Sequence, residues 1–165
     1  MNQTQTWPVR AVCPGSFDPI SRGHLDIIGR ASAVFPDVIV AVGRNTSKSY
    51  LFTFEERLAL TTDAVADIPG VRVAAFDGLL VDFCAQYQAR VIIKGIRFGS
   101  DFDYELQMAQ LNHQLSGVET LLLPAGTEFG AISSSLLREI AQHGGDIAPF
   151  VTDAVNRAVL AKLGR

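Results

Sequence analysis

The feature that most constrains the fold of this chain is an alternation between short runs rich in β-branched residues and longer amphipathic stretches. The apolar runs lie at 9–13, 38–42, 71–76, 91–94 and 119–123. The amphipathic stretches lie at about 24–35, 54–66, 79–88, 101–115, 133–142 and 149–163. Short β-branched runs are typical of strands, and apolar residues that recur every three or four positions are typical of helices.

The order strand, helix, strand, repeated with short links, favours a parallel sheet with helices packed against it. The run 38–42 is apolar at every position, as expected for a strand that is covered on both faces. We therefore predict an α/β fold: a Rossmann-like, doubly wound sheet of five parallel strands with helices on both faces. We expect the first strand to stop at Pro14-Gly15, because these residues commonly end regular structure. Thr53 and Glu56 have the spacing of a capping box, which predicts a helix start there.

Length and composition predict one globular domain over residues 1–165. The length is usual for a single domain, and no repeat or long linker divides the chain. Hydrophobic residues make up 48% and charged residues 19%, a balance that indicates a sizeable core and excludes a disordered chain. Residues 1–8 are polar, and we expect them to form a flexible N-terminal extension.

Charge and cysteine content narrow the class of protein further. A formal net charge of -3 argues against a protein that wraps nucleic acid, although a few local cations still suffice to bind a small anion. No apolar run approaches the ~20 residues that span a membrane, and residues 1–8 do not resemble a signal peptide. We expect a cytoplasmic protein, in which Cys13 and Cys84 are buried free thiols.

The loop after the first strand is the strongest candidate for a functional site. In open parallel sheets, ligands bind beyond the carboxyl ends of the strands. The loop 14–24 follows the first strand and contains two prolines, two glycines and, at the mouth of a helix, His24. Glycines allow backbone N–H groups to approach a phosphate, and a helix N-terminus favours negative charge. A Gly-His pair alone is more often an ordinary surface turn. The prediction of a phosphate site therefore depends on the whole segment 14–24.

That string resembles the signature of the nucleotidylyltransferase superfamily and, within it, of the bacterial phosphopantetheine adenylyltransferases. The resemblance rests on segments 14–24, 46–48, 52–57, 94–97 with 101–105, and 132–135. They occur in the order and spacing of that family, across the chain from Val9 to about Leu163. The resemblance implies transfer of the adenylyl group of ATP to 4'-phosphopantetheine, giving dephospho-coenzyme A and pyrophosphate. It also implies Mg²⁺ bound with ATP, a homohexamer, and feedback binding of coenzyme A.

The resemblance implies roles for particular residues as well. His24 would stabilise the transition state at the α-phosphate of ATP, aided by Lys48 and Arg97. The residues implied for ATP binding are Ser16, Phe17, His24, Gly95, Ile96, Arg97, Glu105, Phe129, Gly130, Ala131, Ile132, Ser133, Ser134 and Ser135. Those implied for phosphopantetheine binding are Ser16, Lys48, Leu80 and Lys94. No protein ligand for a metal is implied.

This chain departs from many relatives at four positions of the pattern. Ser16 and Ser21 stand where threonine is common, and each keeps the hydroxyl. Lys94 stands where arginine is common and lacks the bidentate fork of a guanidinium. Phe129 stands where tryptophan is common and offers a smaller ring to cover the nucleotide. We expect these changes to alter affinities and to leave the chemistry in place.

Several alternatives stay open at this point. The same scaffold could serve another acceptor, such as nicotinamide mononucleotide or glycerol phosphate, or act as a non-catalytic nucleotide sensor. A P-loop at 43–49 is rejected, because the segment is one residue short and has Ser47 in place of the second glycine. Asp18 is a candidate for orienting His24, for stabilising the loop, or for assisting the metal. His113 and His143 have no partners with zinc-ligand spacing.

Overall fold

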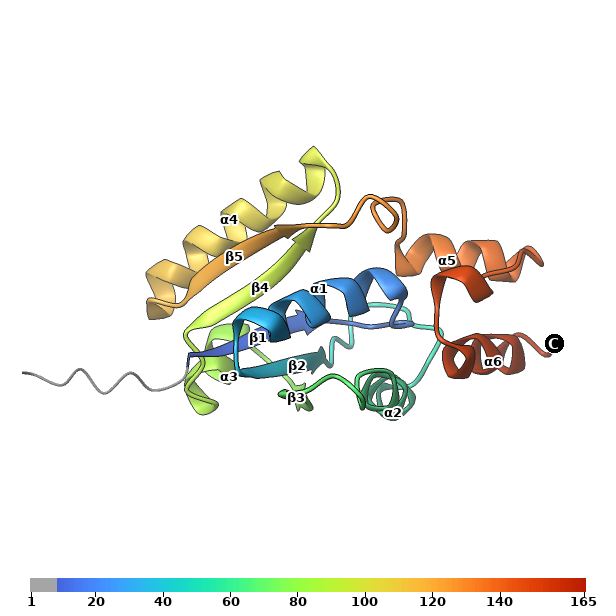
Figure 1. Ribbon diagram of the computed structural model, residues 1–165, viewed down its shortest axis with the longest axis horizontal. Coiled ribbons are helices and arrows are strands. Elements are labelled where there is room, and N and C mark those ends of the chain that lie inside the picture. The colour runs from blue at the N-terminus through green and yellow to red at the C-terminus, as the bar shows by residue number, and fades with distance from the viewer. Residues whose placement is uncertain (1–8) are drawn as a thin grey trace, which may run out of the picture.

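The five predicted strands form one parallel sheet in the order β3-β2-β1-β4-β5, as seen in a computed structural model that describes residues 9–165 (Figure 1). The expectation for residues 1–8 lies outside the described residues. The strands are β1 (Arg10–Gly15), β2 (Asp37–Gly43), β3 (Val71–Phe76), β4 (Val91–Ile96) and β5 (Glu119–Pro124). The helices are α1 (Arg22–Val34), α2 (Phe54–Ala64), α3 (Leu80–Gln86), α4 (Gly99–Ser116), α5 (Ser134–Gln142) and α6 (Asp153–Lys162), with a 3₁₀ turn at Ala148–Phe150.

Helices cover both faces of the sheet, which confirms the predicted doubly wound fold. On one face, Val38, Val40 and Val42 of β2 belong to a core cluster shared with α1, α5 and α6. On the other face, Ile39 and Ala41 belong to a second cluster, shared with α3. Successive side chains of a strand point to opposite faces, so a strand that is apolar at every position supplies both cores. Within residues 9–165, no helix combines the length and the hydrophobicity needed to cross a membrane.

Several predicted boundaries differ from the observed ones. β1 continues through Pro14 and Gly15, which pair with β2, whereas its pairing with β4 covers only Ala11 and Val12. Beyond Val12, β1 therefore forms no sheet hydrogen bonds on the side of β4. Pro14 has no backbone N–H group, and such a residue is tolerated where a strand is paired on one side only. Helix α1 begins at Arg22 because Ser21 provides its N-cap. The predicted helix 149–163 is a 3₁₀ turn followed by α6.

The parting of β1 from β4 positions the functional site. These two strands are the central neighbours at which the strand order reverses. They pair at only two positions each, so their carboxyl ends diverge. A gap of this kind at the switch point is the usual ligand site of a doubly wound sheet. Gly95 of β4 allows α1 to lie close beside the gap, since a Cβ atom there would lie 2.9 Å from Cγ1 of Ile27.

Candidate active site

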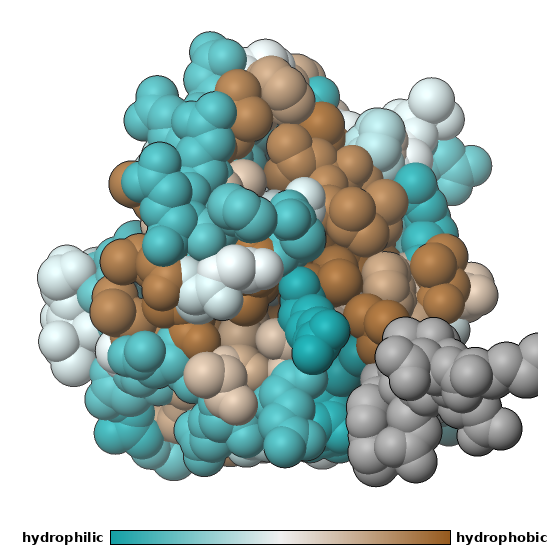
Figure 2. Space-filling view, turned by 90° about the vertical axis from the view of Figure 1, so that its left-hand side faces the viewer, coloured by the Kyte–Doolittle hydropathy of each residue, from teal (hydrophilic) through white to brown (hydrophobic). Residues whose placement is uncertain are grey.

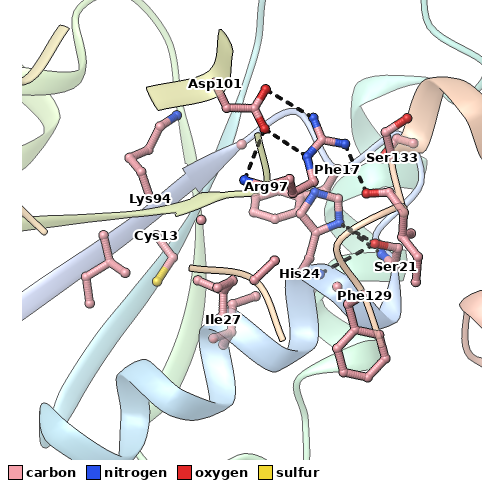
Figure 3. Close-up of a pocket in the computed structure, with 18 of the residues that line it drawn as sticks. Cys13, Phe17, Ser21, His24, Ile27, Lys94, Arg97, Asp101, Phe129 and Ser133 are labelled. Atoms are coloured by element: carbon pink, nitrogen blue, oxygen red, sulfur yellow. Dashed lines mark hydrogen bonds and ion pairs between the residues drawn. The ribbon is translucent and has the colours of Figure 1, made fainter. Parts of the chain in front are cut away.

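A pocket of about 370 Å³ lies between the diverging ends of β1 and β4, within the size range of small-ligand sites (Figure 3). Its walls come from β1, the start of α1, β4, α4 and the segment before α5. The predicted ATP-binding residues that line it are Phe17, His24, Gly95, Arg97, Glu105, Phe129, Ile132, Ser133, Ser134 and Ser135, and Lys94, predicted for phosphopantetheine, lines it as well. The fold thus brings most of the predicted nucleotide site to one place.

His24 is held by an unusual form of the capping box at the start of α1. The Ser21 backbone N–H donates to Nδ1 of His24 over 3.0 Å, and the Ser21 hydroxyl lies 3.0 Å from the same nitrogen. The His24 N–H donates back to that hydroxyl. A glutamate or glutamine usually occupies the position of this histidine. The sequence therefore builds the orientation of the ring into four consecutive residues.

This arrangement determines which ring nitrogen carries the proton. Because Nδ1 accepts a hydrogen bond from a backbone N–H, the proton of the neutral ring must sit on Nε2. Burial, aided by the charges of Arg97 and Lys94, lowers the pKa of His24 to about 4. The ring is therefore neutral near pH 7. His24 therefore offers one N–H donor, from Nε2, to the pocket. Figure 3 shows the contacts of the other ring nitrogen with Ser21.

The first loop is tied down on the side away from the pocket. The Asp18 carboxylate accepts the N–H groups of Leu51 and Phe52 over 2.9 and 3.0 Å, and Arg138 of α5 forms an ion pair with it at 3.3 Å. Of the three roles considered for Asp18, its contacts fit stabilisation of the loop. Phe17 has a left-handed φ of 50°, and its ring lies edge-on to His24 at 5.1 Å between centroids.

Two cations reach the pocket from β4 and its C-terminal end, and each is held by a carboxylate of α4. Lys94 Nζ lies 3.2 Å from Glu105. Arg97 donates from Nε to Asp101 over 3.0 Å and from Nη1 to the carbonyl of Ile132 over 3.0 Å. Asp101 and Glu105 are four residues apart and therefore share one face of the helix. Glu105 thus lies beside a predicted phosphate ligand as well as beside the nucleotide pocket.

The three consecutive serines open α5, as the sequence indicated, and each has a different partner. Ser133 is the N-cap and accepts the N–H of Leu136. The Ser134 hydroxyl donates to the carbonyl of Pro19 over 2.8 Å, and the Ser135 hydroxyl accepts from Arg138. The first N–H groups of a helix have no partner within it and point outward along its axis. The N-terminus of α5 therefore adds backbone donors to the pocket wall.

A second hollow adjoins the first and holds part of the predicted phosphopantetheine site. Ser16, Leu80 and Lys94 line it, together with residues 43–46 after β2. Pro14, Gly15 and Lys94 line both hollows. Lys48 lies on the exposed loop that continues from residues 43–46, outside the lining of either hollow. Ile96, Gly130 and Ala131 also lie outside both linings.

The thiols and the acidic residues add no reactive or metal-binding centre in the described part of the chain. Cys13 and Cys84 are free and buried, as predicted. Burial raises the pKa of the Cys13 thiol to about 12 and that of Cys84 to about 11, so both are protonated and poor nucleophiles near pH 7. Residues 9–165 hold no cluster of three His, Cys, Asp or Glu side chains that would ligate a metal ion.

Comparison with known proteins shows the class of protein to which the chain belongs. Residues 12–140 match the cytidylyltransferase-like family model, so the chain is a nucleotidyltransferase of that family. A solved structure of a proposed nicotinate-nucleotide adenylyltransferase from Vibrio parahaemolyticus has the same fold, with a TM-score of 0.70. That structure is 17% identical, with 94% of this chain and 93% of that chain covered.

Curated relatives then specify the family. A phosphopantetheine adenylyltransferase of Cutibacterium acnes is 56% identical, over 92% of this chain and 96% of the relative. One of Streptomyces coelicolor is 54% identical, over 93% of this chain and 97% of the relative. The chain belongs to the phosphopantetheine adenylyltransferase family.

Sequence reasoning missed two residues that support this site. Asp101, which holds Arg97, was noted only as part of a segment, although its spacing of four residues from both Arg97 and Glu105 was a readable signal. Arg57, which contacts the carbonyls after β1 and at the end of β2, was likewise given no role. No local pattern connects Arg57 with residues 41 and 14 positions earlier in the chain.

Proposed function

We propose that this chain transfers the adenylyl group of ATP to 4'-phosphopantetheine, giving dephospho-coenzyme A and pyrophosphate in coenzyme A synthesis. The observation that carries the proposal is the pair of adjoining hollows, which share Pro14, Gly15 and Lys94. ATP would occupy the hollow lined by His24 and Arg97, and the acceptor would occupy the one lined by Ser16 and Leu80. Lys94 at the shared wall would then contact the acceptor phosphate beside the α-phosphate of ATP.

The reaction itself asks little covalent work of the protein. A phosphate oxygen of phosphopantetheine forms a bond to the α-phosphorus, and the bond from that phosphorus to the bridging oxygen breaks, releasing pyrophosphate. Catalysis of such transfers rests on positioning and on stabilising negative charge. The neutral His24 would donate from Nε2 to an α-phosphate oxygen as charge accumulates there. A donor that needs no proton transfer suits a ring with a pKa of about 4.

The surrounding groups would divide the remaining charge between them. Arg97 and the N-terminus of α5 would bind the outer phosphates of ATP, and Phe129 would cover the nucleotide. Lys48 would reach the acceptor phosphate if the loop after residue 46 moved toward the second hollow. We expect the true substrate to be the Mg²⁺ complex of ATP, with the ion held by phosphate oxygens and water.

The acceptor and the catalytic competence are tested by a direct assay. The protein is incubated with ATP, Mg²⁺ and 4'-phosphopantetheine, and pyrophosphate and dephospho-coenzyme A are measured. Turnover with nicotinamide mononucleotide or glycerol phosphate, and none with phosphopantetheine, would replace the proposed acceptor. Absence of turnover with all three acceptors, together with tight ATP binding, would favour a nucleotide sensor.

Three further properties belong to the same proposal. Coenzyme A shares the phosphopantetheine arm with the acceptor, so we propose that it competes at the second hollow and provides feedback. We also propose a homohexamer, supported by the large exposed apolar side chains of α4. The two free thiols fit a reducing compartment, which supports a cytoplasmic location.

A further inference from the structure

Arg57 of α2 is a buried cation without a carboxylate partner among the described residues. Its side chain is large, yet the residue is only 2% exposed. No carboxylate of residues 9–165 lies within ion-pair distance of it. A buried guanidinium is costly unless other groups compensate for its lost hydration. The position of Arg57 therefore calls for an explanation in terms of what it contacts.

Its hydrogen bonds connect the ends of the two strands that lead into the site. Nη1 donates to the carbonyl of Ser16 over 2.6 Å and to the carbonyl of Gly43 over 3.0 Å. Ser16 directly follows β1, and Gly43 is the last residue of β2. The two protons of one nitrogen thus fix the starting points of the loop 16–20 and of the loop that leads to Lys48.

Aromatic rings hold the guanidinium in this orientation. Its Cζ lies 4.0 Å from the ring centroid of Tyr50 and 5.4 Å from that of Phe54. Arginine stacks in this way and keeps a fixed planar set of donors, whereas lysine offers a flexible point charge. The pocket around Arg57 is therefore built for the shape of a guanidinium as well as for its charge.

The bond to Ser16 has a consequence for the next residue. The Ser16 carbonyl and the Phe17 N–H belong to one planar peptide unit, and in a trans unit they point in opposite directions. The only cis peptide bond among the described residues is Asp18–Pro19, so the unit before Phe17 is trans. No acceptor among residues 9–165 takes the Phe17 N–H. Phe17 lines the nucleotide pocket, and its left-handed φ of 50° needs support from its surroundings.

We propose that Arg57 is a positioning residue: by binding the Ser16 carbonyl, it turns the Phe17 N–H away from α2 and toward the phosphates of ATP. Through Gly43 it also fixes the start of the loop that carries Lys48. Arg57 acts without contacting substrate, since it lines neither hollow. The inference rests on the proposed function, because it assigns the Phe17 N–H an ATP phosphate as its acceptor.

Arg57→Lys tests the inference, because it keeps the charge and loses the rigid donor geometry. We expect kcat/KM for ATP to fall by roughly 10-fold to 100-fold, the usual range for losing hydrogen bonds to a charged group. Val155→Ala serves as the control, since it weakens the buried core of α6 without touching the loop. Both variants are compared by Tm. If Arg57→Lys does not fold, Arg57→Gln replaces it, because its amide still donates to one carbonyl.

Amide NMR provides a readout that a merely structural role would not change. When a non-hydrolysable ATP analogue binds the wild-type protein, the Phe17 N–H signal should shift downfield, as should those of Ser134 and Ser135. In Arg57→Lys the shift at Phe17 should be lost and those at the serines retained, while Val155→Ala should behave as wild type. An unchanged Phe17 shift and unchanged KM in Arg57→Lys would overturn the inference alone. A wild-type protein that does not bind the analogue would overturn the proposed function, and the inference with it.

Discussion

At the scale of single residues, the site depends on where one proton lies. The Ser21 N–H occupies Nδ1 of His24, so Nε2 must carry the proton that faces the pocket. A histidine held in this way is a hydrogen-bond donor and is poorly suited to act as a general base near pH 7. The nearby charges of Lys94 and Arg97 favour the same neutral form. The proposed transition-state donor is therefore oriented by its immediate neighbours in sequence.

Replacing His24 by alanine should lower kcat by about 10²-fold or more, by analogy with the loss of an oxyanion donor. Binding of ATP in the ground state should change less, because the donor matters most when charge has accumulated on the α-phosphate. Single-turnover kinetics and an ATP titration separate the two effects. His143→Ala, on the exposed surface, is the matched control. Equal losses in kcat and in ATP affinity would mean that His24 mainly binds substrate.

The depressed pKa of His24 should also make folding stability depend on pH. In the unfolded chain this ring takes up a proton near its ordinary value of 6.5, whereas in the folded protein burial delays uptake to about 4. Between these values the unfolded state binds more protons, so the free energy of unfolding falls as the pH falls through this window. Urea unfolding at several pH values should show a smaller fall for His24→Gln. If the free energy of unfolding falls equally with pH in both proteins, groups other than His24 cause the loss of stability in acid.

At the scale of elements, carboxylates of α4 hold the two cations of the site, Lys94 near the end of β4 and Arg97 in the turn that follows. Asp101 and Glu105 lie one turn apart and hold Arg97 and Lys94, respectively. Arg97 also bonds to the carbonyl of Ile132 in the segment before α5. One face of α4 thus fixes the positions of Lys94 and Arg97. The N-terminus of α5 lies in another wall of the same pocket.

Asp101→Asn should therefore raise KM for ATP with little effect on KM for phosphopantetheine. The ion pair is partly exposed, so the expected change is modest, roughly 2-fold to 5-fold. Asp103→Asn removes the same charge from a neighbouring position that does not share the helix face, and it should leave both constants unchanged. Steady-state kinetics with each substrate varied in turn measures the difference. Equal effects of the two variants would point to net charge as the cause.

At the scale of the whole molecule, the strand order places the site and leaves part of the surface uncovered. The first hollow opens where the strand order reverses between β1 and β4, and the second adjoins it at the same carboxyl ends of the strands. Elsewhere, apolar side chains gather in a band on the face shown in Figure 2. The large exposed apolar residues of α4 and β5 are Phe102, Tyr104, Leu106, Leu111, Leu115 and Leu121. A surface of this kind is typical of an interface between protein chains.

If the proposed hexamer forms, sedimentation should give a particle of six chains. Leu115 is 67% exposed on α4, and Leu115→Glu should shift the distribution toward smaller species because it places a charge among the exposed apolar side chains of this helix. Val34 is 73% exposed at the end of α1, and Val34→Glu should leave the hexamer intact. A monomer in the wild-type protein would contradict the proposed assembly. A hexamer that survives Leu115→Glu would move the interface away from this part of α4.

The layout of the fold was predictable because local sequence carries it. A run such as Val38–Val42 is apolar on both faces, and only a strand between two layers of helices buries both. The capping box of Thr53 and Glu56 is formed as predicted, because caps involve neighbouring residues. The prediction for Pro14 was wrong, because whether a strand tolerates proline depends on which side of it is paired, and pairing is a property of the sheet.

The sequence by itself thus determined the alternation of elements and the family resemblance, since each rests on patterns of residues close together along the chain. The capping contact between Ser21 and His24 is equally local, but it was not predicted. Only the tertiary structure decided how Lys94 is paired and what anchors the first loop. Arg57 of α2 donates to the carbonyl of Ser16, 41 positions earlier in the chain, and Lys94 of β4 forms an ion pair with Glu105 of α4. Such contacts follow from the packing of α2 and α4 against the sheet. Packing joins residues whose separation along the chain leaves no periodic signal.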